Sequence, residues 1–275
     1  MKKKTATIIL NRNLPIPTDK LFNKIKKYNK DYTDIFIVDA GSQSKLISKN
    51  TTWVANWKSA KKNGLRFARG MNFALDKMIE EKIFKNYEFF LLLTNDSEVE
   101  KKQFIKKLSN ILKDNPKIGI LSPCSKKWGE KFFLKKEKIK FFWYIHNNAY
   151  FIRRKFIEKI LNKKKPGYIN LLFDGSNFRG YGLESELIAK AYKNNWAAAI
   201  TSDVWVEENE SYLLNHSKVI KTENFDENLK LYIDEGYKWM KKKYGFMSKW
   251  SIQMYVKRFY DDFFKKNPNL QKFKI

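Results

Sequence analysis

Residues 89–96 read Phe89-Phe90-Leu91-Leu92-Leu93-Thr94-Asn95-Asp96, an unbroken apolar run that ends in polar residues. A run without polar alternation predicts a strand that is covered on both faces, as in the parallel sheet of an α/β protein. A second run, Ile35-Phe36-Ile37-Val38-Asp39-Ala40-Gly41-Ser42, also ends in an acid and leads into a glycine turn. In an open α/β sheet, ligands bind at the carboxyl ends of the strands. The two runs therefore predict an α/β fold with a site near Asp39 and Asp96.

Apolar runs and amphipathic segments alternate along the first half, which is typical of βαβ units around a mainly parallel central sheet flanked by helices. We expect strands at residues 5–10, 35–38, 89–94, 118–121, 148–152 and 197–206. We expect helices at residues 18–28, 69–82, 103–113, 154–161 and 183–194, and an exposed loop or hairpin at the lysine-rich stretch 126–140. After residue 224, aromatic and basic residues interleave in long helical segments. The sequence therefore predicts an α/β domain at residues 1–223 and a basic, aromatic helical extension at residues 224–275.

The few cysteines and histidines exclude two common ways of stabilising a fold. A single cysteine, Cys124, rules out an internal disulfide, and with only His146 and His216 it cannot supply a Cys/His structural zinc site.

The apolar segment after Lys2–Lys4 is too short for the h-region of a signal peptide. No stretch approaches the roughly 18 apolar residues of a membrane span. We therefore expect a cytoplasmic protein, either soluble or peripheral on the inner membrane.

The formal net charge of +27 is open to several interpretations. Such a charge attracts nucleic acid, anionic membrane surfaces and phosphorylated ligands, or is simply a solvated lysine-rich surface. Nucleic acid is the less favoured partner, because the aromatic residues of the first half lie in apolar runs and not in a basic stacking stripe. The sequence contains no Gly-x-x-x-x-Gly-Lys-Ser/Thr or Gly-x-Ser-x-Gly motif, which argues against a nucleoside triphosphatase and a serine hydrolase.

Two glutamates lie in the predicted first turn of a helix, in Gly180-Tyr181-Gly182-Leu183-Glu184-Ser185-Glu186-Leu187. The helix dipole favours acids there without any catalytic role. Alternatively, Glu184 is a general base. The two acids are two residues apart and cannot share a helix face, so at most one points at a substrate. Asp96 is likewise either a metal ligand or a helix cap.

Five segments, taken in order, resemble family-2 glycosyltransferases with the Rossmann-like GT-A fold, and in particular their rhamnosyltransferase-like branch. Residues 37–42 are similar to that family's VDNGS segment, 67–72 to FAGGNN, 93–98 to LNNDVE, 148–154 to GAxxxIRR and 182–191 to GEDVDLCLRA. The resemblance runs from about Thr5 to Val206. It implies that residues 1–223 form a GT-A catalytic domain that uses a nucleotide-sugar donor.

The resemblance also implies roles for single residues. Contacts with the donor nucleotide are implied for Asn11, Asp39, Gly41, Ser42, Arg66, Arg69, Asn72 and Asn95. Glu184 is the implied base of an inverting hexosyl or deoxyhexosyl transfer, and Asn148 and Glu186 lie on the acceptor side. Asp96 is the implied ligand of Mn²⁺ or Mg²⁺ on the donor diphosphate. The implied setting is the synthesis of a bacterial surface polysaccharide such as capsule or O-antigen, with a glycan or lipid-linked acceptor.

The sequence departs from the family pattern at the metal motif. Thr94 stands where an acid or asparagine is expected, and Glu184 stands where aspartate is usual. No histidine follows the last predicted strand, so Glu207 or His216 would have to complete the metal site. Two alternatives remain: a GT-A-like protein without transferase activity, and a basic nucleic-acid-binding protein. The extension packs its aromatic face on the catalytic domain or lies against anionic lipid, and both can hold, because a docked helix still presents lysines outward.

Overall fold

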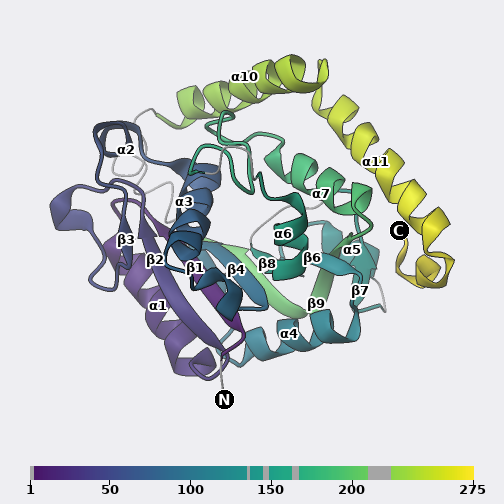
Figure 1. Cartoon of the computed structure of the whole chain (residues 1–275), viewed down its shortest axis with the longest axis horizontal. Helices are drawn as coiled ribbons and strands as arrows, with labels where there is room; N and C mark the ends of the chain where they lie inside the picture. Colours follow the sequence, from purple (N-terminus) through teal and green to yellow (C-terminus); the bar gives the residue numbers. More distant parts are fainter. Residues whose placement is uncertain (1–2, 135–136, 145–148, 163–166, 210–223) are drawn as a thin grey trace.

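The computed structural model describes residues 3–134, 137–144, 149–162, 167–209 and 224–275 (Figure 1). The strands are β1 (Thr5–Asn11), β2 (Thr33–Asp39), β3 (Trp53–Val54), β4 (Phe89–Thr94), β5 (Ser97–Val99), β6 (Ile118–Cys124), β7 (Ile139–Phe141), β8 (Tyr150–Arg153) and β9 (Ala197–Glu208). The helices are α1 (Pro15–Asn29), α2 (Lys58–Asn63), α3 (Arg66–Glu80), α4 (Phe104–Asp114), α5 (Glu130–Leu134), α6 (Arg154–Ile160), α7 (Leu183–Lys193), α10 (Phe225–Tyr244) and α11 (Lys249–Lys266).

The strands form a sheet with the order β3-β2-β1-β4-β8-β6-β9-β5, and β7 pairs with β9 outside this path. β3, β2, β1 and β4 are parallel, so their carboxyl ends meet at one edge. β6 and β9 are also parallel, whereas β8 runs antiparallel between β4 and β6. This mostly parallel, helix-flanked sheet confirms the predicted α/β class. Residues 89–93 of β4 are almost fully buried between β1 and β8, as the unbroken apolar run predicts.

Several predicted segments differ in detail from the structure. The helix expected from residue 69 begins earlier, at Arg66, and the strand expected to end at residue 206 continues to Glu208. The lysine-rich stretch expected to be a loop or hairpin contains the short helix α5 and the strand β7. Leu134 of α5 and Phe141, the last residue of β7, are buried, and they anchor the two elements to the core.

The C-terminal helices pack on the α/β domain with their aromatic face. Figure 1 shows α10 and α11 as an arc along the outer side of the molecule, with α7 inside it. Tyr260 and Phe263 of α11 are buried, and their rings lie 5.3 and 5.4 Å from the ring of Tyr192 in α7. Packing of the aromatic face on the domain is therefore confirmed. The predicted boundary between residues 223 and 224 stays a prediction, because residues 210–223 lie outside the described ranges.

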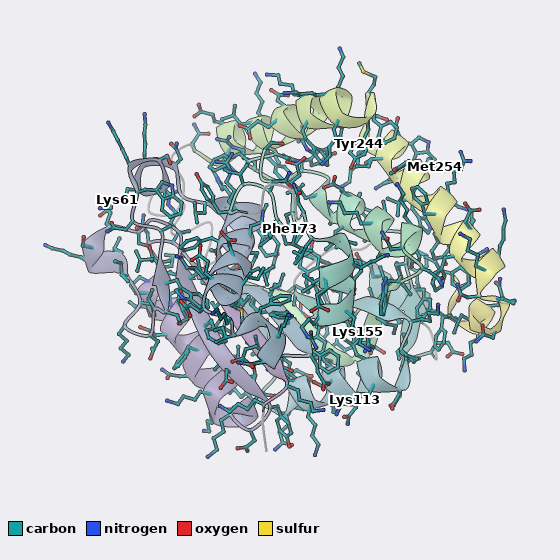
Figure 2. The ribbon with its side chains drawn as sticks, viewed as in Figure 1. Lys61, Lys113, Lys155, Phe173, Tyr244 and Met254 are labelled. Atoms are coloured by element: carbon teal, nitrogen blue, oxygen red, sulfur yellow. The ribbon has the colours of Figure 1, made fainter. Side chains whose placement is uncertain are left out.

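Both charged and apolar side chains are exposed on the surface. Lysines such as Lys61 and Lys113 extend away from the ribbon (Figure 2), whereas Trp250 and Met254 of α11 are 64% and 39% exposed. Within the described ranges, no helix has both the length and the apolar content needed to cross a membrane.

Candidate active site

Three of the predicted donor-site residues meet at the carboxyl ends of β1, β2 and β4. Asn11, the last residue of β1, donates a hydrogen bond of 2.9 Å from Nδ2 to Oδ2 of Asp39 at the end of β2. Asn95 follows β4 and donates from Nδ2 to Oδ1 of Asn11 over 3.3 Å. The parallel register of the strands therefore brings residues far apart in the sequence into one hydrogen-bonded row.

Asp39 is fully buried and holds the turn that follows β2. Its Oδ1 accepts hydrogen bonds from the backbone N–H groups of Gly41 and Ser42, and its Oδ2 accepts one from the Ser42 hydroxyl over 2.6 Å. Gly41 has a φ of 89°, and a Cβ there would lie 2.2 Å from the carbonyl oxygen of Ala60, so only glycine fits. In the structure, Asp39 therefore fixes the turn at Gly41 and Ser42, which borders the carboxyl edge of the sheet.

Two arginines line a cavity of about 110 Å³ beside this row. Arg12 comes directly after β1 and donates from Nη2 to the carbonyl of Lys62, and Arg66 begins α3. Arg66 has a φ of 54°, a left-handed conformation that costs a non-glycine residue roughly 1–2 kcal/mol. Thr94 and Asn95 form the wall at the end of β4. Strained backbone of this kind clusters at functional sites, and the cavity presents positive charge at the ligand-binding edge.

Arg69 and Asn72 lie further along α3 and hold the loop at residues 168–178. Asn72 is buried, with its Oδ1 accepting from the backbone N–H groups of Leu172 and Phe173. Its Nδ2 donates to the carbonyl of Phe173. Arg69 donates from Nε to the carbonyl of Gly175, and its guanidinium lies 4.6 Å from the ring centroid of Phe178. These two residues hold that loop against α3, and their predicted contacts with the donor nucleotide stay predictions.

Asp96 lies in the turn after β4 and is only 8% exposed. Burial raises the pKa of its carboxyl group, opposed by hydrogen bonds from Thr94 and from its own backbone. It lines a cavity of about 210 Å³ together with Lys20 and Lys24 of α1 and with Glu98. Among the described residues, no three His, Cys, Asp or Glu side chains form a set that could hold a metal ion. One carboxylate still suits a cation that receives its other ligands from a diphosphate and water.

Of the other two metal candidates, Glu207 does not join Asp96 in the part of the chain that the structure describes. Glu207 accepts hydrogen bonds from the Ser125 hydroxyl over 2.6 Å and from the Lys126 backbone N–H over 2.7 Å. Both of its carboxylate oxygens are thus bound to the segment after β6. His216, like the predicted acceptor-side residue Asn148, lies outside the described residues.

Glu184 and Glu186 face different surroundings in the first turn of α7. Glu186 is 3% exposed, and its Oε1 lies 2.6 Å from Nζ of Lys243 and 2.5 Å from the hydroxyl of Tyr244, both in α10. It therefore faces the C-terminal helix, although the resemblance implies the acceptor side. Glu184 is partly exposed. Burial and then the charge of Glu184 raise the pKa of Tyr232. This geometry agrees with the expectation that Glu184 and Glu186 do not share a face of the helix.

Three charged residues near the candidate site were not predicted from the sequence. Arg12 shares the cavity with Arg66, and its position directly after a strand end was the available signal. Glu208 pairs with Ser97 across β5 and β9, and its charge also contributes to the raised pKa of Tyr232, after burial and Glu184. The alternation of side chains along β9 places Glu208 on the opposite face from Glu207. Asp174 lies in a loop and forms an ion pair with Lys243, which no local pattern indicates.

Comparison with known proteins identifies the fold. Neither a protein-family model nor a curated protein sequence matches the chain. The crystal structure of S. aureus TarS 1–349 in complex with UDP superposes with a TM-score of 0.52 at 12% identity, over 87% of this chain and 73% of that one. The same protein in complex with UDP-GlcNAc gives 0.50 at 13% identity, over 87% and 74%.

A third solved structure comes from another glycosyltransferase. GalNAc-T7 with UDP, GalNAc and Mn²⁺ superposes with a TM-score of 0.53 at 11% identity, over 88% of this chain and 56% of that one. At such identities the likeness establishes the fold and leaves the substrates open. The mostly parallel sheet, the row of polar residues at its carboxyl edge and these superpositions together show that the chain has the GT-A glycosyltransferase fold.

Proposed function

We propose that the protein transfers a sugar from a nucleotide-sugar donor to a hydroxyl group of a glycan or glycolipid acceptor. The observation that carries this proposal is the cavity lined by Arg12 and Arg66 beside the Asn11–Asp39–Asn95 row. Guanidinium groups suit the oxygens of a diphosphate, since they donate several hydrogen bonds in a fixed plane. UDP and UDP-GlcNAc are bound by TarS, which has the same fold, and we carry the donor class over from it.

In the proposed reaction, Glu184 takes the proton from the acceptor hydroxyl. The hydroxyl oxygen then forms a bond to the anomeric carbon of the donor while the bond from that carbon to the diphosphate oxygen breaks, which inverts the configuration. Negative charge develops on the departing nucleoside diphosphate. Arg12 and Arg66 would stabilise this charge from fixed positions, the kind of electrostatic help that contributes most to many enzymatic rates.

The surroundings of Asp96 suit a divalent cation. Asp96 is a buried carboxylate whose pKa is raised by that burial, and a bound cation would favour its charged form. We propose Asp96 as the protein ligand of Mn²⁺ or Mg²⁺, which would neutralise charge on the diphosphate. In GalNAc-T7, Mn²⁺ is present together with UDP. Glu207 is the weaker candidate for a second ligand, because both its oxygens hold the segment after β6.

We further propose the rhamnosyltransferase-like branch, hexosyl or deoxyhexosyl transfer, and a role in bacterial surface polysaccharide synthesis at the cytoplasmic side of the inner membrane. The five motif-like segments support the branch. The net charge of +27 supports contact with an anionic membrane surface.

Calorimetric binding of UDP, GDP, dTDP and CMP, each with and without Mn²⁺, tests the proposal. One nucleotide should bind, more tightly with Mn²⁺ than without it. Arg66→Ala should weaken that binding by about tenfold, the loss of a charge-assisted hydrogen bond. Arg154→Ala is the matched control, since Arg154 begins another helix and pairs with Glu158. Failure of all four nucleotides to bind would favour a fold without transferase activity or a nucleic-acid-binding protein.

A further inference from the structure

A second cavity, of about 550 Å³, lies between α5, the segment after β7 and α11. Its walls include Phe133 of α5, Phe142 and Trp143 after β7, and Gln253 of α11. The rings of Phe133 and Phe142 meet edge to face at 5.9 Å. Its volume falls within the range of pockets that hold small organic ligands, which are usually lined by apolar and aromatic side chains. The proposed donor cavity with its two arginines differs from it in both lining and position.

An exposed aromatic side chain lines this cavity. Phe133 of α5 is 55% exposed. Large exposed aromatic residues that adjoin an apolar hollow are characteristic of surfaces that receive an apolar ligand. An apolar hollow of this kind fits the hydrocarbon part of a ligand.

Tyr144 connects the cavity to the turn that precedes α7 and Glu184. It lines the cavity, and Nζ of Lys249 donates to its hydroxyl over 3.4 Å. The same ammonium group lies 5.1 Å from the ring centroid of Tyr181. Burial, Tyr237 and then Glu184 raise the pKa of Tyr181, so Tyr181 lies within electrostatic reach of Glu184. Contacts therefore lead from the apolar cavity past Lys249 to Tyr181, which lies in the turn before α7, three residues ahead of Glu184 in the sequence.

We propose that this cavity binds the hydrocarbon chain of a lipid-linked acceptor, whose sugar hydroxyl then lies at Glu184. The proposal rests on the transferase function above and names its acceptor class. Lys249, between the cavity and Tyr181, is positioned to meet an anionic group that joins chain and sugar. The proposed ligand is a single acceptor molecule. The competing explanation is that this apolar surface contacts a lipid bilayer.

The test uses the full chain and dodecyl phosphate below its micellar concentration, with inorganic phosphate as the probe that lacks a chain. Binding is followed by tryptophan fluorescence, since Trp143 lines the cavity, and by calorimetry. Phe133→Ser removes part of the wall, and Gln253→Trp fills the cavity from α11. Phe132→Ser is the matched control: it is the neighbouring phenylalanine of the same helix and is not part of the lining.

Dodecyl phosphate should bind and inorganic phosphate should not. Phe133→Ser and Gln253→Trp should each weaken binding by about tenfold, whereas Phe132→Ser should change it less than twofold. Equal losses in Phe132→Ser and Phe133→Ser, together with tighter binding to anionic vesicles than to the single amphiphile, would show membrane contact and overturn the proposal. Binding that neither cavity variant alters would also overturn it. Nucleotide calorimetry on the same samples distinguishes this failure from a failure of the proposed transferase function, because nucleotide binding does not involve the cavity.

Discussion

Lys243 of α10 and Glu186 of α7 form an ion pair, with Nζ 2.6 Å from Oε1, around a carboxylate side chain that is 3% exposed. The same ammonium group also pairs with Asp174, in the loop that precedes α7. One lysine thus joins the C-terminal extension to the helix turn that carries Glu184. The extension therefore helps to position the predicted base.

Replacing Lys243 by methionine should lower the free energy of unfolding by about 2 kcal/mol. Two largely buried carboxylates would lose their cation, which costs roughly 3–5 kcal/mol in a fully buried pair, and solvent screening of a lysine side chain that is 35% exposed reduces this. Urea denaturation measures the change. Lys242→Met, an exposed neighbour in the same helix, should leave stability nearly unchanged. Equal losses in both variants would contradict a role for the ion pair.

The same network should make the protein sensitive to acid. Burial alone would raise the pKa of Asp174, but hydrogen bonds from Lys243, Ser176 and Trp239 hold it well below its ordinary value. A lowered folded-state pKa adds stability above the unfolded value of about 4, and this stability is lost as pH falls below it. Urea midpoints measured between pH 6 and pH 3 should show that loss. In Asp174→Asn the curve should be flatter over this interval, and an unchanged curve would rule out Asp174 as its source.

Glu184→Gln should abolish sugar transfer while leaving donor affinity nearly intact. Loss of a general base reduces turnover by roughly 10²–10⁴-fold. Initial rates combined with nucleotide calorimetry separate the two effects. Glu186→Gln is the informative comparison, because it should mainly lower stability through the lost pair with Lys243. A Glu184→Gln protein with unchanged turnover would exclude Glu184 as the base.

Asp96→Asn should remove the Mn²⁺-dependent part of nucleotide binding and keep the metal-independent part. The amide has the shape of the carboxylate but lacks its charge, so the cation loses its ionic ligand. Thermal shifts with nucleotide, with and without Mn²⁺, report the difference. Glu207→Gln should retain the Mn²⁺ effect, since its carboxylate binds Ser125 and Lys126. An equal loss of binding with and without Mn²⁺ in Asp96→Asn would identify Asp96 as a structural residue of the turn.

Gly236 in α10 should not tolerate a methyl group. A Cβ at this position would lie 2.5 Å from Cβ of Tyr181, so the helix would have to move away from the domain. Glycine to alanine inside a helix normally stabilises by up to about 1 kcal/mol, whereas overpacking costs about 1–3 kcal/mol. We expect Gly236→Ala to be destabilising in urea, with the exposed Lys238→Ala as the neutral control. A stabilised Gly236→Ala protein would show that α10 does not pack closely on Tyr181.

The sequence predicted the elements that depend on local pattern. The apolar run at residues 89–94 marks an interior strand, and its flanking strands confirm this. The direction of β8 was not predictable, because an apolar run looks the same in a parallel and an antiparallel strand. Its place between β4 and β6 is decided by which strands can cover its two sides, which is a property of the whole sheet.

The candidate site was predictable where residues follow strand ends and not where they pair over long distances. Asn11, Asp39 and Asn95 meet because parallel strands end at one edge. The partner of Glu186 is Lys243, more than fifty residues away, and nothing near either residue specifies the other. The donor contact of Asn72 stays a prediction, and the bonds of its amide to the backbone of a later loop were not predictable from its own segment.

The packing of α11 on α7 has a consequence for the nascent chain. The side of α7 that carries Tyr192 is covered by Tyr260 and Phe263, which the ribosome adds 68 and 71 residues after Tyr192. At typical translation rates this aromatic surface is without its cover for a time on the order of ten seconds. Over that interval the half-made protein offers chaperones, and other nascent chains, an apolar face that the finished protein conceals.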